Sequence, residues 1–394
     1  MTVRCWAAAV LVLSCAAAPA RAQDAQAQNA PSSPWQWGVD GAAFGGYNYQ
    51  YRKFTDFDEV ESQDWLMASL ARSLGAASYL ELIGMFSLEP VTLRDLGSPQ
   101  VFQTGETFGG RPLIDYQHPH DLVMNLGAEL THSMGATMLS FEAYAVGPAP
   151  YGPTVFMHRP SAVDNPQVPL SHHYLDASHI TTGVVSIGFE RSGFRAEVGA
   201  FHGREPDENR LDLDTGALDS YGGRLSWSDG PWAIQLSGAD LKTPERASAY
   251  DAKRVTASVS FFKGDENRSI AWLAAAGQNR EVHGNLEAYL IEATRLVGKN
   301  VFYTRVESVA KDILDAGFHP VGVAHRHRQS QVNALTLGYV RDLSRRAWGT
   351  IGIGGDVTGY TVPANLSESY GAPLSFHIFA RYRGRAGAKG AHVH

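Results

Sequence analysis

The stretch Arg254-Val-Thr-Ala-Ser-Val-Ser-Phe261 alternates without a break between polar and apolar side chains. In an extended chain, successive side chains point to opposite faces, so the valines, the alanine and the phenylalanine share one face. The same alternation returns over residues 374–383, close to the C-terminus. Both stretches therefore predict strands of a sheet that has one apolar face and one polar face.

About 16 such runs follow one another, and the gaps between them alternate in length. We expect strands at 35–52, 63–74, 77–89, 120–132, 136–147, 178–190, 194–204, 218–228, 231–242, 253–262, 269–278, 282–295, 300–310, 331–341, 347–360 and 372–383. Gaps after even-numbered strands are short, whereas those after odd-numbered strands are mostly long: 53–62, 90–119, 148–177, 205–217, 243–252, 311–330 and 361–371. A chain that crosses a membrane up and down needs this parity, because only the loops on one side are free to grow.

The predicted fold is all-β: an antiparallel transmembrane β-barrel of about 16 strands, with short periplasmic turns and long extracellular loops. A barrel of this size encloses a lumen too wide for side chains to fill, so we expect the polar face inside and the apolar face toward lipid. The loops 90–119 and 148–177 are long enough to fold inward. Aromatic residues near strand ends are typical of interfacial girdles: Trp35, Trp37, Trp65, Tyr79, Trp227, Trp232, Tyr339, Trp348 and Tyr360.

The N-terminus has the features of a secretory signal, with Arg4, an apolar stretch and the small-x-small site Ala20-Arg21-Ala22. A lipoprotein signal at Cys15 is an alternative that fits less well, because a leucine stands two positions before it. Cleavage after Ala22 removes both cysteines, so we expect no disulfide in the mature chain. The expected segments are 1–22 (signal peptide), 23–34 (flexible periplasmic lead), 35–383 (transmembrane barrel) and 384–394 (C-terminal tail).

Composition narrows the class of partner. The formal net charge of −7 argues against nucleic acid. For a barrel in the bacterial outer membrane, the expected partners are membrane lipids and lipopolysaccharide, the barrel-assembly machinery, and small polar solutes or metal ions. Association into a homo-oligomer stays open.

Histidines gather in the long gaps, where an adjacent aspartate adds a carboxylate. The candidate metal ligands are His118, His120, His158, His172, His173, Asp176 and His179. Neutral imidazole suits Cu(II) and Zn, and an H-x-H pair on an extended strand places both rings on one face. The alternative is an internal loop whose histidines hydrogen-bond its own backbone and the charged wall, and that alternative requires no cofactor. A third group, His319, His325 and His327, lies in the gap 311–330.

Charged residues on the expected inward faces are candidates for lining a pore: Arg195, Glu197, Arg224, Arg305, Glu307 and Arg381. Such charges order water and sort solutes by charge, or they brace the wall without selecting anything. The acidic segment 205–219 favours a solvated outer loop, with divalent bridging to lipopolysaccharide as the alternative.

Several local motifs carry a resemblance: Asp115-Tyr-Gln-His-Pro-His-Asp121, Phe156-Met-His-Arg-Pro160, Ser171-His-His-Tyr-Leu-Asp176, Gly203-Arg-Glu-Pro-Asp-Glu208 and Asn300-Val-Phe-Tyr-Thr-Arg-Val-Glu307. With the strand pattern, they resemble an uncharacterised family of Gram-negative outer-membrane barrels that is associated with heavy-metal or copper resistance. The resemblance implies location more firmly than activity. One departure is the tail after Tyr382, because such barrels usually end on an aromatic residue.

The expected function is therefore an outer-membrane channel for passive passage of small polar or ionic solutes. The first alternative is a metal-binding outer-membrane protein that handles Cu or Zn. The second alternative, and the third candidate function, is an outer-membrane lipid hydrolase, for which the pair His132-Ser133 is the only local hint. No G-x-S-x-G motif is present, so we expect no enzyme.

Overall fold

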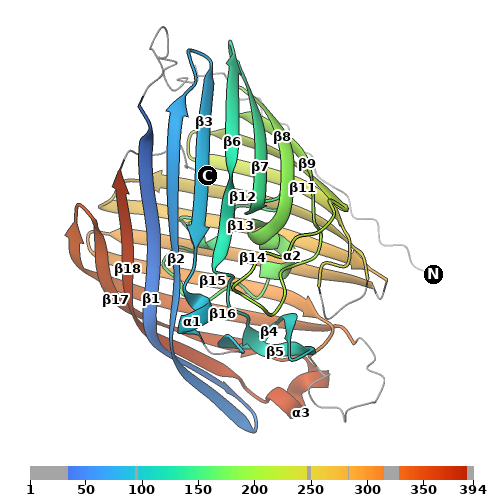
Figure 1. The fold of residues 1–394 in the computed structure, drawn as a ribbon. Coiled ribbons are helices and arrows are strands. Elements are labelled where there is room, and N and C mark those ends of the chain that lie inside the picture. The colour runs from blue at the N-terminus through green and yellow to red at the C-terminus, as the bar shows by residue number, and fades with distance from the viewer. Residues whose placement is uncertain (1–33, 94–95, 246–249, 283, 315–327, 388–394) are drawn as a thin grey trace, which may run out of the picture.

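The computed structural model describes residues 34–93, 96–245, 250–282, 284–314 and 328–387. Within these ranges, sixteen antiparallel strands close into one barrel in the order β1-β18-β17-β16-β15-β14-β13-β12-β11-β10-β9-β8-β7-β6-β3-β2 (Figure 1). The first eight barrel strands are β1 (Gln36–Arg52), β2 (Thr55–Ser73), β3 (Ser78–Phe86), β6 (Val123–Met134), β7 (Thr137–Gly147), β8 (Thr181–Arg191), β9 (Phe194–Phe201) and β10 (Ser220–Asp229). The others are β11 (Trp232–Leu241), β12 (Ala252–Gly264), β13 (Arg268–Glu281), β14 (Gly284–Val297), β15 (Asn300–Lys311), β16 (Ser330–Arg346), β17 (Gly349–Thr361) and β18 (Leu374–Gly387).

The predicted fold class is confirmed, and each expected run coincides with one barrel strand. One expected gap, 53–62, is wrong, because β2 begins at Thr55 and pairs with β1 down to the turn at Lys53 and Phe54. The charges of residues 55–62 suggested a loop. The β1–β2 hairpin instead extends beyond the neighbouring strands at the lower end of Figure 1. Charged residues are compatible with strand structure in this protruding part of the hairpin. At the other end of the chain, β18 continues past the expected boundary at 383 to Gly387.

The direction of the side chains follows the predicted alternation. On β12, Arg254 and Thr256 are each 1% exposed, whereas Val255 between them is 40% exposed. On β18, Ile378 is 63% exposed between two buried neighbours. Apolar side chains therefore cover the outside of the barrel, as a wall in contact with lipid requires.

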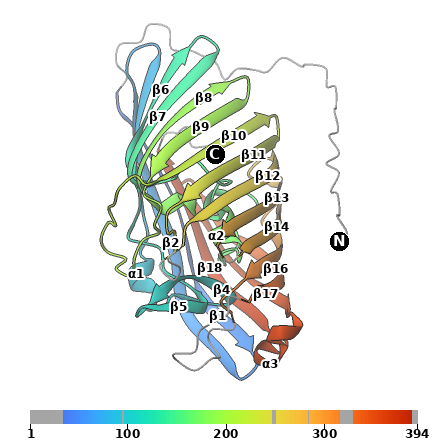
Figure 2. The same cartoon turned by 90° about the vertical axis from the view of Figure 1, so that its right-hand side faces the viewer.

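Two long connections fold into the barrel, as expected. The β3–β6 connection contains α1 (Glu89–Thr92) and the separate hairpin of β4 (Ser98–Phe108) with β5 (Arg111–Gln117). The β7–β8 connection contains η1 (Phe156–His158), α2 (His172–Leu175) and η2 (Ala177–Ile180), and both views place α2 within the ring of strands (Figures 1 and 2). The β17–β18 connection contains η4 (Ala364–Leu366) and α3 (Ser367–Tyr370). Among the described residues, no helix has the length and apolarity of a membrane span.

Part of the interior is apolar, which differs from the expectation that the polar face of the sheet points inward. Val101 and Phe102 of β4 and Leu170 and Tyr174 of the β7–β8 connection pack against the inner wall. The wall contributes buried apolar residues to the same cluster: Leu286, Ala288, Val309, Ala310, Val332 and Ala334. Inward-facing wall residues are expected to be polar where they contact water. These wall residues instead contact apolar side chains of the folded loops, so they are apolar.

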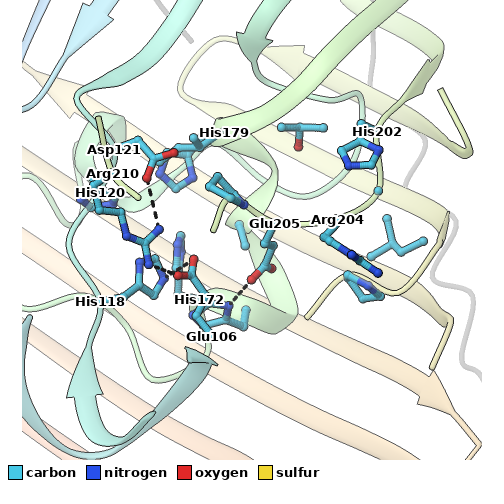
Figure 3. A pocket seen from close by; sticks show the side chains of 18 of the residues that line it. Glu106, His118, His120, Asp121, His172, His179, His202, Arg204, Glu205 and Arg210 are labelled. Carbon is cyan, nitrogen blue, oxygen red and sulfur yellow. Dashed lines mark hydrogen bonds and ion pairs between the residues drawn. The ribbon is translucent and has the colours of Figure 1, made fainter. Parts of the chain in front are cut away.

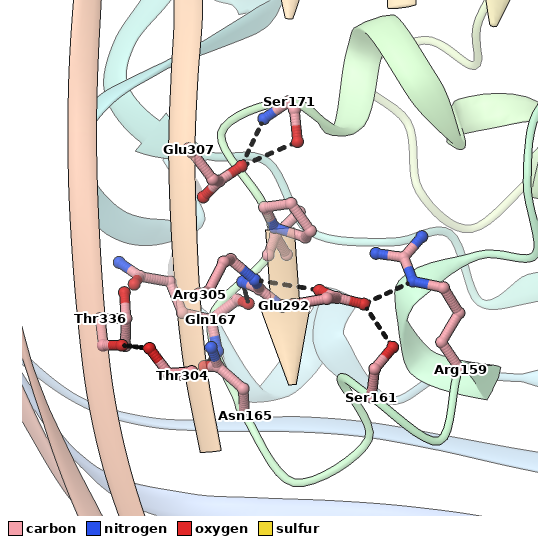
Figure 4. Close-up of polar contacts among 12 residues, drawn as sticks. Arg159, Ser161, Asn165, Gln167, Ser171, Glu292, Thr304, Arg305, Glu307 and Thr336 are labelled. Carbon is pink, nitrogen blue, oxygen red and sulfur yellow. Dashed lines mark hydrogen bonds and ion pairs between the residues drawn. The ribbon is translucent and has the colours of Figure 1, made fainter. Parts of the chain in front are cut away.

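Polar contacts hold the same loop against β14 and β15 (Figure 4). Glu292 accepts hydrogen bonds from Arg159 Nε and Ser161 Oγ, both at 2.8 Å. Arg305 donates to the carbonyl oxygen of Gln167 at 2.6 Å. The wall therefore satisfies backbone and side-chain groups that the loop would otherwise bury without partners.

The outward face provides a test of the membrane assignment. Leu236 lies within β11 and is 52% exposed, so we expect Leu236→Arg to destabilise the barrel in lipid by about 2–4 kcal/mol. Val282 is 68% exposed in the gap between β13 and β14, and Val282→Arg serves as the matched control with little effect. Urea unfolding in lipid vesicles measures both, and equal costs at the two positions would contradict a lipid-facing β11.

Candidate functional site

Five histidines lie together in a cavity between the two loops that fold into the barrel (Figure 3). His118 and His120 follow β5, His172 and His173 begin α2, and His179 lies in η2. The five side chains are arranged in a circle, and we call this circle of five histidines the imidazole ring. Neighbouring centroids in it are separated by 5.4 Å (120–179), 5.2 Å (179–172), 5.3 Å (172–173), 5.5 Å (173–118) and 6.5 Å (118–120). The empty space between the lining residues, part of which is open solvent, amounts to about 540 Å³, and His202 also lines it.

Each Nδ1 of the imidazole ring faces an oxygen. His120 Nδ1 lies 2.8 Å from Glu89 Oε2, and His172 Nδ1 lies 2.6 Å from Asp176 Oδ1. His118 Nδ1 faces the carbonyl of Pro119 at 3.0 Å, His179 Nδ1 faces the carbonyl of Asp176 at 3.3 Å, and His173 Nδ1 lies 3.4 Å from Glu205 Oε2. A carbonyl only accepts, so the hydrogen bonds of His118 and His179 place the proton on Nδ1.

The opposite nitrogens are buried without hydrogen bonds. This holds for Nε2 of His118, His120, His173 and His179. His118 Nε2 lies 3.2 Å from the carboxylate of Glu106. Backbone approaches the ring closely at Gly105, whose φ is +134° and where a Cβ atom would stand 2.5 Å from His173 Nε2. A side chain at that position would displace the imidazole.

Burial sets the charge state of the imidazole ring. It lowers the pKa of His118, His172 and His179, so these three rings are neutral at neutral pH. Burial acts in the same direction on His120 and His173. There the carboxylates of Glu89 and Glu205 outweigh it and raise the pKa of each ring.

A strap from the β9–β10 connection, residues 203–214, closes one side of the cavity. Its Arg210 forms ion pairs with Glu106 and with Asp121, the latter at 3.2 Å, and its carbonyl accepts from the Leu122 amide at 2.8 Å. Burial nevertheless raises the pKa of Glu106 to about 7 and that of Asp121 to about 6, although Arg210 opposes both shifts.

The expectation of a fully solvated acidic loop at 205–219 is therefore wrong for its first part. Glu205 lines the cavity, and Glu208 accepts hydrogen bonds from Thr107 Oγ1 at 2.6 Å and from the amides of Gly109 and Gly110. Three carboxylates of this loop, Asp207, Asp212 and Asp214, are the only His, Cys, Asp or Glu side chains in the described ranges that bring three ligand atoms within 4.8 Å of one another. They are partly or fully exposed, as a hydrated turn would be.

The structure brings together most of the candidate metal ligands. His158 is the exception, because it packs edge-on against Trp65 with ring centroids 4.7 Å apart. Asp176 pairs with Arg159 as well as with His172, so it orients the ring rather than facing the cavity. The candidates His319, His325 and His327 lie outside the described residues, as does the expected signal peptide.

Sequence reasoning missed four carboxylates and one cation of the site: Glu89, Glu106, Asp121, Glu205 and Arg210. Asp121 and Glu205 do occur in the quoted motifs at 115–121 and 203–208, next to residues that line the cavity. Nothing in the local sequence marks Glu106 or Glu89, which reach the site only through the fold of the β3–β6 connection.

The expected pore-lining charges all point into the barrel, in two groups. Arg195 and Glu197 on β9 and Arg224 on β10 pair along the wall, with Arg224 Nε 2.7 Å from Glu197 Oε2. The second group, Arg305, Glu307 and Arg381, bonds to the folded β7–β8 connection. The arginines of the second group are buried beneath that connection, whereas Arg195 and Arg224 of the first group stay partly exposed, although Arg224 also donates to the Gly152 carbonyl of the same connection.

Comparison with known proteins concerns the fold. No family model matches the chain, and no curated protein matches it. Among solved structures, OprB of Pseudomonas putida, in a high-pH structure, matches with a TM-score of 0.54 over 90% of this chain and 94% of that chain, at 11% identity. An anion-selective porin from Comamonas acidovorans matches with a TM-score of 0.49 at 14% identity, over 90% and 100% of the two chains. The match to OprB, together with the closed sheet, shows that this chain has the porin-like fold of an outer-membrane β-barrel.

Proposed function

We propose that the protein is an outer-membrane channel through which small polar or ionic solutes pass passively. Sixteen strands enclose a lumen that side chains alone do not fill, so passage depends on how much of it the loops cover. The observation that carries the proposal is that the loops cover the inner wall unequally.

The less covered part of the wall carries charge. The side chains of Arg195 and Arg224 are each 25% exposed, whereas those of Arg305 and Arg381 are 2% and 3% exposed beneath the loop. Both exposed arginines contact Glu197, which gives the wall of β9 and β10 an array of both signs. Charged arrays of this kind order water and sort solutes.

The chain between the cavity and this array is short. Tyr151 lines the cavity, and the next residue, Gly152, accepts a hydrogen bond from Arg224 through its carbonyl at 3.3 Å. The Gly152 amide donates to Ser237 Oγ on β11 at 2.8 Å. A solute that leaves the cavity past this segment would therefore meet the charged array of β9 and β10.

A second candidate function, metal binding linked to uptake or resistance, is favoured by the imidazole ring. Cu and Zn are the metals that such donors suit. The association with heavy-metal resistance stays a prediction. A lipid hydrolase is the third candidate, and its hint is weak. His132 Nδ1, near the end of β6, lies 2.9 Å from Ser78 Oγ at the start of β3, and neither residue lines the cavity.

The anchoring of the loop predicts a change in conductance. Arg159→Met removes the ion pairs to Asp176 and to Glu292, and loss of one partner of a buried pair costs about 3–5 kcal/mol. We therefore expect larger and more variable current steps than in the wild type, measured in planar lipid bilayers. Lys253→Met, at a 71% exposed side chain, is the control with unchanged steps. Silence of both wild type and Arg159→Met would contradict the channel.

The strap provides a second test. Arg210→Met leaves Glu106 and Asp121 buried without their cation, so we expect residues 203–214 to detach while the barrel stays folded. Hydrogen exchange of peptides from this segment should rise at least tenfold. Arg204→Met in the same strap is the matched control, because Arg204 is exposed and bonds to Thr243 Oγ1 at 3.1 Å. Equal exchange in the two variants would show that Arg210 does not hold the strap.

A further inference from the structure

The spacing of the imidazole ring matches that of rings sharing one metal ion. A metal–nitrogen bond of about 2.0–2.1 Å and a tetrahedral angle place two imidazole centroids roughly 5 Å apart. Four of the five neighbour separations lie between 5.2 and 5.5 Å, and only the His118–His120 pair is wider, at 6.5 Å. Neighbouring rings therefore already stand at the distance that joint coordination needs.

The orientation of the rings also suits a cation. In protein metal sites, a ligating histidine donates its other N–H to a carboxylate or a carbonyl, which fixes the tautomer. His120 on Glu89, His172 on Asp176 and His179 on the carbonyl of Asp176 have this arrangement. The Nε2 atoms of His120 and His179 are buried and lack hydrogen-bond partners, so one nitrogen on each of these adjacent rings is unused.

We propose that the cavity binds dications of the later transition metals, the class of Cu²⁺, Ni²⁺ and Zn²⁺, through pairs of neighbouring imidazoles centred on His179. This inference rests on the proposed channel and names its solute. Within the described residues, no three nitrogens of the ring come within 4.8 Å of one another, so each ion has two imidazole ligands and completes its shell with water. Weak sites in sequence let an ion leave as readily as it enters, which conduction requires.

The surrounding charge favours a cation. Glu89, Asp176 and Glu205 stand behind three of the rings, and Glu106 lies 3.2 Å from His118 Nε2. Arg210 already occupies the space between Glu106 and Asp121 as an internal cation. Phe156 packs against His120 and His172 and adds an apolar contact to these two rings.

Metal titration of the full-length protein, refolded in detergent without a histidine tag, tests this inference. We expect Zn²⁺ and Ni²⁺ to bind by calorimetry and Mg²⁺ not to bind. His179→Gln should weaken Zn²⁺ binding roughly tenfold or more, because loss of even an outer-shell partner of a ligand typically costs about 10–100-fold in metal affinity. His158→Gln is the matched control, because His158 lies in the same connection but packs on Trp65 outside the ring. His120→Gln tests the same pair if His179→Gln does not fold.

Two further measurements separate the possible failures. The electron paramagnetic resonance spectrum of bound Cu²⁺ should show two coordinated imidazole nitrogens, and four would overturn pairwise binding. Zn²⁺ should block the potassium chloride current at a lower concentration in the wild type than in His179→Gln. If current flows but His179→Gln binds Zn²⁺ like the wild type, the metal inference is wrong and the channel stands. If Zn²⁺ binds as expected but the wild type carries no current, the channel is wrong and both the stepwise passage and the solute assignment fall with it.

Discussion

Closure of the sheet is the constraint on which the rest of this structure depends. A chain that crosses a membrane through strands must pair every backbone N–H and C=O within the sheet, because lipid offers no partner. β1 meets this requirement by pairing with β2 on one side and with β18 on the other, from Gly38 opposite Gly387 to Tyr51 opposite Leu374. The last strand of the chain therefore completes the first, and neither carries a free edge over that length.

Closure around sixteen strands creates the next problem, which is an interior that wall side chains cannot fill. The β3–β6 and β7–β8 connections fill much of it, but they bring backbone groups and charges with them. Side chains of the wall provide hydrogen-bond partners for these groups. Glu307 accepts a hydrogen bond from the Ser171 amide, and Lys311 donates one to the Leu170 carbonyl at 3.0 Å. Buried ion pairs add little net stability, yet a wrong loop position would leave them unpaired. They therefore fix where the loops lie, and with that the position of the cavity.

The strands could be predicted from sequence because their signal is local. Alternation within Arg254 to Phe261 is visible in eight consecutive residues, and the structure confirms both the strand and its inward face. The site could be predicted only where local patterns carried it, as in the pairs at 118–120 and 172–173. The contact of Glu106 with Arg210 joins residues 104 positions apart, and no local pattern encodes it. The polarity of the sequence also led to two wrong expectations. The charged residues 55–62 suggested a loop where the β1–β2 hairpin continues, and the polar inward faces gave no indication of the apolar cluster around Phe102.

The choice of histidine inside the cavity follows from the same physics of burial. Carboxylates and guanidinium groups that are buried together pair and neutralise each other, as Arg159 does with Glu292, and such a pair has no capacity left for a passing ion. A buried imidazole whose N–H faces a carbonyl, such as His179, becomes neutral instead, and it keeps one lone pair. Leaving the Nε2 atoms of His120 and His179 without hydrogen-bond partners costs stability. Local conflicts of this kind concentrate at functional sites, and here the conflict lies where the two loops narrow the barrel.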